Sequence, residues 1–386
     1  MKISAKISAK TAALAILATS SLFLSAQAPA TIEGKESTLK IGFMAQPSFE
    51  AVESSNSKLE GTSQNLFLRR MRLMLSGNIG TDFEYFIITD DATLGKGVAD
   101  GTKTNGGFVI QDAVLTYKFT EKIKLDAGLI IVPLSHISTQ AATNLHSWDF
   151  GTYAFSQSSP MGSSTNRDGG MQVRGVVGKT HGNLEFRLGV FQGKRAAQVS
   201  ATEETLGKVN ARNSFRLAGR AQWNFFDAEG GLFLGGSYLG AKKVLSIGVG
   251  HDRQEDYSAT AVDVYMDMPI GSNGIMGQFD YVIMDGGKWL PTLRKQTTNF
   301  AELGYRIGAL KLSPMVRYES RKMDIPLADA SSCDETRVGA GLAWWFKGHQ
   351  NNLKVFYTKV DPQNVGESKT LKAYNQINVQ WQMLFW

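Results

Sequence analysis

Seven cationic residues alternate with apolar residues along the chain. They are Arg70, Arg72, Lys124, Arg174, Arg187, Arg216 and Arg220. A guanidinium group offers planar, paired donors to an oxyanion, and a series of shallow sites lets an anion leave as well as enter. Residues of this type at this spacing could therefore form a pathway for anions. Each of them could equally pair with a carboxylate and serve only to keep its surface hydrated.

Acidic residues share the same alternating face. In the first half of the chain they are Glu84, Asp90, Asp112, Asp126 and Glu185. In the second half they are Asp263, Asp267, Asp280 and Glu302, partly offset by Arg306, Lys311 and Arg317. We therefore expect an arginine-bearing first half to face a more acidic second half.

The longest connection between predicted strands, residues 135–168, carries few ionisable groups. Its cationic candidates are His136, His146 and Arg167, and its acids are Asp149 and Asp168. If this segment folded inward, so little acid would not repel anions, and its serine hydroxyls could hydrogen-bond them. We expect His136, His146 and Arg167 to lie at such a constriction. An ordinary exposed loop is the alternative.

Other chemistry finds little support in the sequence. None of the five histidines pairs with another at the spacing of a zinc site, and there is no Gly-rich phosphate cradle or haem-attachment motif. The acidic stretches at 90–91 and 252–256 fall at the ends of predicted strands, where solvated charges are common. We therefore predict no metal site, no cofactor and no enzymatic activity. Sequence spacing does not exclude a catalytic serine and histidine that folding brings together.

Strands must position these residues, because apolar and polar side chains alternate with a period of two. Between residues 215 and 225 the odd positions are largely apolar, and the even positions include Arg216 and Arg220. Residues 67–76 repeat the pattern, with Phe67 on the apolar face. The wall strand of a transmembrane barrel alternates in this way for about 9 to 11 residues. The sequence thus predicts an all-β chain folded as an antiparallel transmembrane β-barrel.

The connections between predicted strands alternate between short and long. Short turns such as 80–81 and 120–121 separate some strands, and stretches of about 10 to 40 residues separate others. This asymmetry yields about sixteen strands. Residues 231–240 could add one more, but an odd number would reverse the sidedness of the later loops. We therefore interpret 227–242 as a long inner connection, with an eighteen-strand barrel as the alternative.

The first thirty residues are typical of an export signal. Lysines precede an uncharged stretch over 11–24, and small residues follow it. We predict a signal peptide over residues 1–30 and a barrel over 31–386, with Ala26, Ala28 and Ala30 as alternative cleavage positions. A membrane-anchor helix is the alternative, but the apolar stretch is shorter than the ~20 residues that span a bilayer.

Charge and cysteine content exclude several classes of protein. Three lysines lie in the first thirty residues, so the formal net charge falls from +6 to +3 over the rest of the chain. So small a net positive charge argues against a nucleic-acid partner. The single cysteine, Cys333, cannot form an internal disulfide, which excludes small disulfide-stapled folds. No second apolar run is long enough for a membrane helix.

Five segments, in this order, resemble the phosphate-selective porin O and P family. They are residues 67–77 (FLRRMRLMLSG), 112–119 (DAVLTYKF), 128–133 (GLIIVP), 167–175 (RDGGMQVRG) and 188–193 (LGVFQG). The resemblance covers most of the chain and is strongest from 65 to 225. It implies a sixteen-stranded barrel of the bacterial outer membrane, in contact with lipid and usually a homotrimer. Its third loop, here residues 135–168, would fold into the lumen.

The main functional hypothesis is a water-filled channel for passive diffusion of small anionic solutes, phosphate or other oxyanions. A general, non-specific porin is the first alternative, in which the acids of the wall cancel the arginines. A structural barrel that sheathes a partner protein is the second. A soluble β-sandwich adhesin is a rival at the level of the fold.

Overall fold

The computed structural model describes residues 30–97, 102–104, 106–163, 165–179, 181–195, 214–324, 333–365 and 370–386. The expected signal peptide, residues 1–30, lies outside the described residues apart from Ala30. Strands make up most of the described chain, and the helices are single turns.

The strands of the first half are β1 (Ala30–Glu33), β2 (Thr38–Glu53), β3 (Thr62–Ile79), β4 (Phe83–Leu94), β5 (Val109–Lys118), β6 (Ile123–Ile131), β7 (Arg167–Gly178), β8 (Asn183–Phe191) and β9 (Arg216–Asn224). Those of the second half are β10 (Val244–Gln254), β11 (Tyr257–Ile270), β12 (Asn273–Asp285), β13 (Gln296–Arg306), β14 (Leu312–Met323), β15 (Asp334–His349), β16 (Asn351–Gln363) and β17 (Tyr374–Phe385). The short helices are α2 (His136–Thr139), η1 (Ala142–Asn144), α3 (Ser158–Met161) and η3 (Gly308–Leu310).

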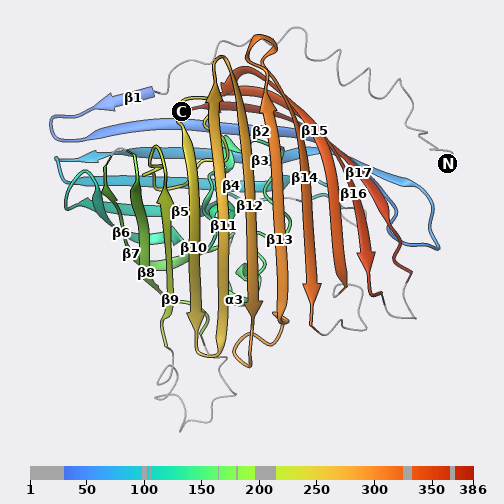
Figure 1. Cartoon of the computed structure of the whole chain (residues 1–386). Helices are drawn as coiled ribbons and strands as arrows, with labels where there is room; N and C mark the ends of the chain where they lie inside the picture. The colour runs from blue at the N-terminus through green and yellow to red at the C-terminus, as the bar shows by residue number, and fades with distance from the viewer. Residues whose placement is uncertain are drawn as a thin grey trace.

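Strands β2 to β17 close into a ring (Figure 1). Each pairs antiparallel with the next strand along the chain, and β17 returns to β2 with Ile377 opposite Ala51. Within the described residues the barrel thus has the sixteen strands that the sequence predicts. Closure leaves no open sheet edge, which a lipid bilayer would penalise strongly. The short β1 pairs only with the start of β2.

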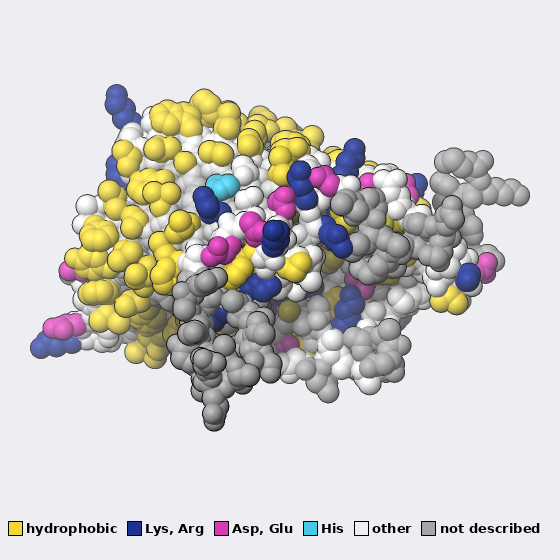
Figure 2. All heavy atoms as spheres, turned by 90° about the horizontal axis from the view of Figure 1, so that it is seen from below, with side chains coloured by type: hydrophobic (Ala, Val, Ile, Leu, Met, Phe, Trp, Pro, Cys, Tyr) yellow, Lys and Arg dark blue, Asp and Glu magenta, His cyan; other side chains and the backbone are white. Residues whose placement is uncertain are grey.

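Outward-facing side chains are mostly apolar. On β9, Leu217 and Trp223 are about half exposed, and on β10 Ile247 and Val249 are likewise exposed. Figure 2 views the barrel from below Figure 1 and shows hydrophobic side chains over the wall, with charged side chains gathered on the end face. This distribution suits a wall that contacts lipid.

None of the helices that the structure describes is long and apolar enough to cross a membrane.

A bulge in β3 changes the side of the wall on which the Phe67 side chain lies. The pairing with β2 shifts between Ala45 and Pro47, so that β3 contains one extra residue at this point. Pro47 has no N–H to donate to the ladder, and a bulge accommodates that loss. On the far side of the bulge Phe67 is 8% exposed and its neighbour Leu66 is 78% exposed. The expectation that Phe67 lies on the lipid-facing side is therefore wrong.

The connection between β9 and β10 contains no additional strand. The ladder continues to a hydrogen bond from Asp227 N to Lys243 O (2.9 Å), and residues 231–240 form only an isolated bridge to Gln140. The interpretation of 227–242 as a connection rather than an additional strand is confirmed, and the strand number stays even.

Two connections make hydrogen bonds with inward-facing side chains of the wall. We call residues 132–166 the outer segment, in which residue 164 is not described, and residues 228–242 the inner segment. Inward-facing side chains are correspondingly buried, and Arg216, Asp252 and Asn352 have no exposed surface.

Candidate functional site

The outer segment is anchored to carboxylates of the second half of the wall. It enters α2 through a capping box, in which Ser135 and Ser138 each bond the backbone N–H of the other. The next two backbone amides donate to carboxylates of the wall. His136 N donates to Asp263 (3.1 Å), and Ile137 N donates to Asp280 (3.0 Å). These acids of the predicted acidic half thus satisfy the free amides at the start of a helix.

Arginines of the first half and an acid of the second anchor the inner segment. Arg174 donates to Gly230 O (3.3 Å), and Arg187 donates to Leu232 O (2.6 Å). Further along the segment, Tyr238 N donates to Asp267 of β11 (2.6 Å). Cationic side chains of the wall therefore contact carbonyl groups of the inner segment, and a carboxylate of the wall contacts one of its amides.

The two segments contact each other directly. Leu234 N donates to Thr139 O, and Ala141 N donates to Leu234 O, both at 3.1 Å. The His136 ring lies 3.0 Å from the Glu229 carboxylate, and both side chains are fully buried. The segments thus form one connected body that is bonded to the wall on several sides.

Between the outer segment and the wall lies a cavity of about 260 Å³. Its cationic lining is Arg69, Arg70, Arg72, Arg167, Arg317 and Arg337. Its acids are Asp90, Asp149 and Glu319, and its aromatic rings are Trp148, Phe150 and Phe155. The lining therefore holds twice as many cations as carboxylates.

Asp149 organises one side of this cavity. Its carboxylate accepts from Arg70 (2.5 Å) and Arg69 (2.7 Å), and the Arg70 guanidinium lies 5.4 Å from the centre of the Phe150 ring. Burial alone would raise the pKa of the Asp149 carboxyl, but the charges and hydrogen bonds of the two arginines hold that pKa well below its usual range. Asp149 is therefore ionised, and it fixes both guanidinium groups.

The other cavity arginines have partners that lie largely outside the lining. Arg167 bonds Asp112 (3.1 Å), Arg317 bonds Glu302 (2.9 Å) and Arg337 bonds Glu335 (2.6 Å). Arg72 bonds Asp90 through one nitrogen (2.7 Å). Its Nε is buried and has no hydrogen-bond partner among the described residues.

The structure separates the seven predicted cations, although each of them is ion-paired. Arg70 and Arg72 line the 260 Å³ cavity. Lys124 and Arg174 line a second cavity of about 240 Å³ beside the inner segment, where their partners are Glu84 and Asp126. Arg187, Arg216 and Arg220 line neither of these cavities and pair with Glu185, Asp252 and Asp263.

Of the three predicted constriction residues, Arg167 alone lines the larger cavity. His136 is stacked on Tyr265 at 4.0 Å between ring centroids and serves the contact between the segments. His146 is buried beside Trp345, and burial lowers its pKa to about 4. Near neutral pH His146 is therefore uncharged.

Arg69, Arg337 and the aromatic residues were not among the predicted site residues. The bulge in β3 lets Arg69 reach Asp149 although strict alternation assigns it to the lipid-facing side. Arg337 could have been found, because exposed Val338 and Leu342 place odd positions of β15 inward. The aromatic rings of the outer segment carry no periodic signal that marks them.

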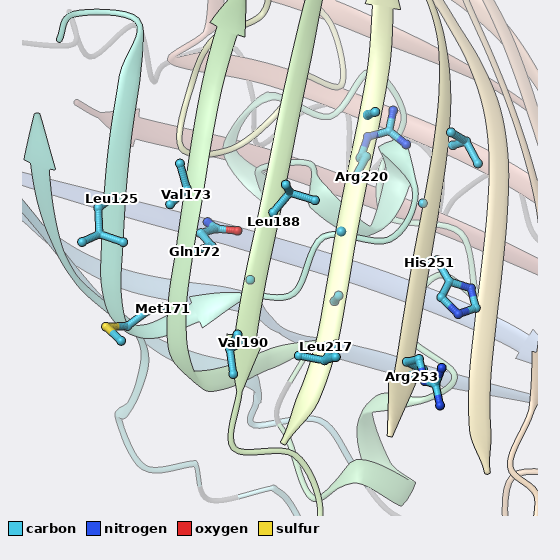
Figure 3. Close-up of a pocket in the computed structure, with 16 residues that line it drawn as sticks. Leu125, Met171, Gln172, Val173, Leu188, Val190, Leu217, Arg220, His251 and Arg253 are labelled. Carbon is cyan, nitrogen blue, oxygen red and sulfur yellow. The ribbon is translucent and has the colours of Figure 1, made fainter. Parts of the chain in front are cut away.

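A larger hollow than either of these cavities lies elsewhere, on the outside of the wall over β6 to β10. It measures about 700 Å³, and Figure 3 shows Leu125, Val173 and Leu188 among the residues that line it. His251 and Arg253 lie at its edge on β10. Most of its lining is apolar and belongs to the outer face, so it is separate from the 260 Å³ cavity.

Among the described residues no group of three or more His, Cys, Asp or Glu side chains could hold a metal ion.

Several solved outer-membrane proteins share the fold. OmpF of Salmonella typhi, in complex with daunomycin, has a TM-score of 0.58 at 14% identity, covering 92% of this chain and 100% of that chain. The channel DcaP of Acinetobacter baumannii has a TM-score of 0.57 at 14% identity with the same coverage. OmpT of Vibrio cholerae, in its trimer form, has a TM-score of 0.53 at 12% identity, covering 91% and 100%. A comparison with curated proteins finds no significant match.

The sequence pattern of the phosphate-selective porin O and P family matches residues 39–250. The match runs from β2 into β10 and covers more than half of the 386 residues. It includes the arginine-rich strand β3 and the outer segment. The chain therefore belongs to the phosphate-selective porin O and P family and forms a channel for passive diffusion across the bacterial outer membrane.

Proposed function

We propose that this channel prefers anions and that phosphate or related oxyanions are its solutes. The observation that carries the proposal is the lining of the 260 Å³ cavity, with six arginines and three carboxylates. A cleft lined by one sign of charge between low-dielectric walls concentrates ions of the opposite sign. Guanidinium groups also match the geometry of oxyanions.

The outer segment supports this proposal as a constriction that narrows the passage beside the arginines. It is tied to strands around the ring, because Arg70 of β3 bonds Asp149, and Arg317 of β14 bonds Asp149 O (2.6 Å). Lys354 of β16 donates to Leu145 O (2.8 Å) and Ser147 O (2.9 Å). We infer that the segment crosses the lumen and holds its aromatic rings opposite the cationic wall.

A general, non-specific porin is the second candidate. The observation that favours it is the pairing of all seven predicted cations with carboxylates. Paired charges produce a weaker field at a distance than isolated ones. The two candidates differ in whether the excess of arginines around the cavity outweighs this pairing.

Single-channel recording in planar bilayers under a salt gradient tests the proposal. We expect a reversal potential that shows anion preference, and we expect the double variant Arg70→Gln, Arg72→Gln to reduce it. The matched control is Arg253→Gln, since Arg253 is exposed on the outer face. Cation preference in the unchanged protein would refute anion selectivity, and chloride currents that phosphate fails to block would exclude phosphate as the solute.

We further infer that the protein is exported through a cleaved signal peptide over residues 1–30 and assembles as a homotrimer in outer-membrane lipid. The family and the trimer form of OmpT support this assembly. Mass spectrometry of the mature N-terminus tests cleavage, and crosslinking in membranes tests the trimer. A barrel that shows no conductance and co-purifies with a stoichiometric partner would instead favour the sheath alternative.

A further inference from the structure

The inner segment brings three consecutive apolar residues, Leu232, Phe233 and Leu234, into the barrel. Leu234 is 1% exposed, and Leu232 packs against a buried cluster that includes Val114. Three consecutive apolar residues would be unfavourable in a connection that was exposed to water. Burying it excludes water from the part of the interior that it fills.

Phe233 lies between the arginine cavity and a row of aromatic rings. Its ring centre is 5.6 Å from the guanidinium of Arg167, which lines the cavity, and 5.7 Å from the ring of Phe86. Phe86 in turn lies 5.9 Å from Trp386, and Lys40 Nζ lies 4.5 Å above the Trp386 ring. The row therefore leads from the arginine cavity to the end of the barrel where β17 finishes.

An apolar cluster of wall residues surrounds this row of rings. It consists of Met44, Met74, Ile88 and Leu384, with Phe86 and Trp386 packed against it. These side chains occupy inward-facing positions that would carry polar residues in a uniformly wet channel. The surroundings of this row of rings are thus apolar, in contrast to the cationic cavity.

Close backbone contacts hold the inner segment in this position. At Gly236 an added Cβ would lie 2.7 Å from Leu145 Cα and 2.9 Å from Asn144 O, so only glycine allows the two segments to approach so closely. Ser237 O lies 2.9 Å from the His349 ring at the end of β15. Together with the bonds from Arg187, these contacts attach the segment to separate parts of the wall.

We propose that the inner segment is a second, apolar constriction in series with the arginine cavity, and that Phe233 and Phe86 form its narrow part. Apolar constrictions in channels resist the passage of hydrated ions because water leaves them readily. This constriction limits the conductance of the pore, whereas the arginines set its preference between anions and cations. The inference rests on the channel function and is independent of anion preference.

Shortening the inner segment tests the proposal directly. The hydrogen bond from Asp227 N to Lys243 O closes the β9–β10 ladder, so Asn-Gly can replace residues 228–242 as a hairpin turn. We expect the single-channel conductance to rise by about twofold or more, with a reversal potential of unchanged sign. Heat-modifiable migration on gels checks that the variant barrel folds.

A point variant keeps the proposal testable if the shortened chain does not fold. Phe233→Ala should raise the conductance by a smaller amount, while Phe279→Ala, which removes a ring that is 45% exposed on the outer wall, should leave it unchanged. Equal conductance of Phe233→Ala and Phe279→Ala would overturn the inference, as would a folded shortened barrel with unchanged conductance. A cationic reversal potential with raised conductance would refute anion preference alone.

Discussion

Arg187 donates to carbonyls of the inner segment, and Asp263 and Asp280 accept from amides of the outer segment. The peptide groups of such irregular segments have no ladder partners, and each buried group left unpaired costs about 1–3 kcal/mol. Ionised side chains form hydrogen bonds roughly twice as strong as neutral ones. The charged side chains of the wall therefore hold the two segments in place.

Arg216 is the clearest case of a charge that serves structure. It has no exposed surface, and it bonds Asp252 through two nitrogens, at 2.8 Å and 2.5 Å. Asp252 also accepts from the Tyr257 hydroxyl (2.7 Å). A solute could displace this pair only by unfolding its surroundings, so we assign Arg216 to the wall.

We predict that Asp252→Ala destabilises the barrel by about 3–5 kcal/mol, because it leaves the Arg216 guanidinium buried without its main partner. Urea unfolding of the protein in lipid vesicles measures the change. Lys295→Ala is the control, since its partner Asp324 and Lys295 itself are more than half exposed, and no shift of the midpoint is expected. Equal midpoints for the two variants would contradict the assignment.

At the scale of elements, the path of the outer segment depends on the wall that it passes. Gly250 of β10 faces inward, and a Cβ added there would lie 1.9 Å from Leu134 O. The backbone of the outer segment therefore passes directly over a position where the wall has no side chain.

Gly250→Val should displace the start of the outer segment from the wall and alter single-channel conductance. Gly277→Val provides the comparison, because the nearest atom to its added Cβ is the flexible end of Met266 at 3.3 Å. Recordings from both variants, with folding checked by heat-modifiable migration, give the readout. If Gly250→Val conducts like the unchanged protein, the outer segment does not control the passage.

At the scale of the whole molecule, closure of the ring and the hydrogen bonds between its strands and the two segments belong together. β17 pairs with β2, and the two segments then bond to strands from both halves of the chain. Wall, outer segment and inner segment therefore form a single packed unit. Such units open as a whole rather than by local fraying.

Hydrogen exchange monitored by mass spectrometry tests whether the wall and the two segments open as one unit. The amides of Ala141 and Leu234, which bond between the two segments, should exchange as slowly as amides of the wall strands. The amide of Lys58, whose local hydrogen bond to Asn56 Oδ1 is exposed in the connection between β2 and β3, should exchange much faster. Rapid exchange at Ala141 and Leu234 would show that the segments detach from the wall.

The sequence by itself determined the wall. The period of two between residues 215 and 225 places Arg216 and Arg220 inward and Leu217 outward, as the structure confirms. The even strand number and the long connection at 227–242 followed from the parity of the turns. These features could be predicted because alternation and turn chemistry depend on residues that are close together in the chain.

Only the tertiary structure decided which residues contact one another across the barrel. A bulge in β3, opposite the stretch between Ala45 and Pro47, turned Phe67 inward and let Arg69 reach Asp149. Ring closure brought Arg337 into the cavity beside Arg70. The meeting of the two segments likewise depends on residues that are distant in the chain. Local periodicity specifies the face on which a side chain lies, but the partners across the interior are set by the geometry of the closed barrel.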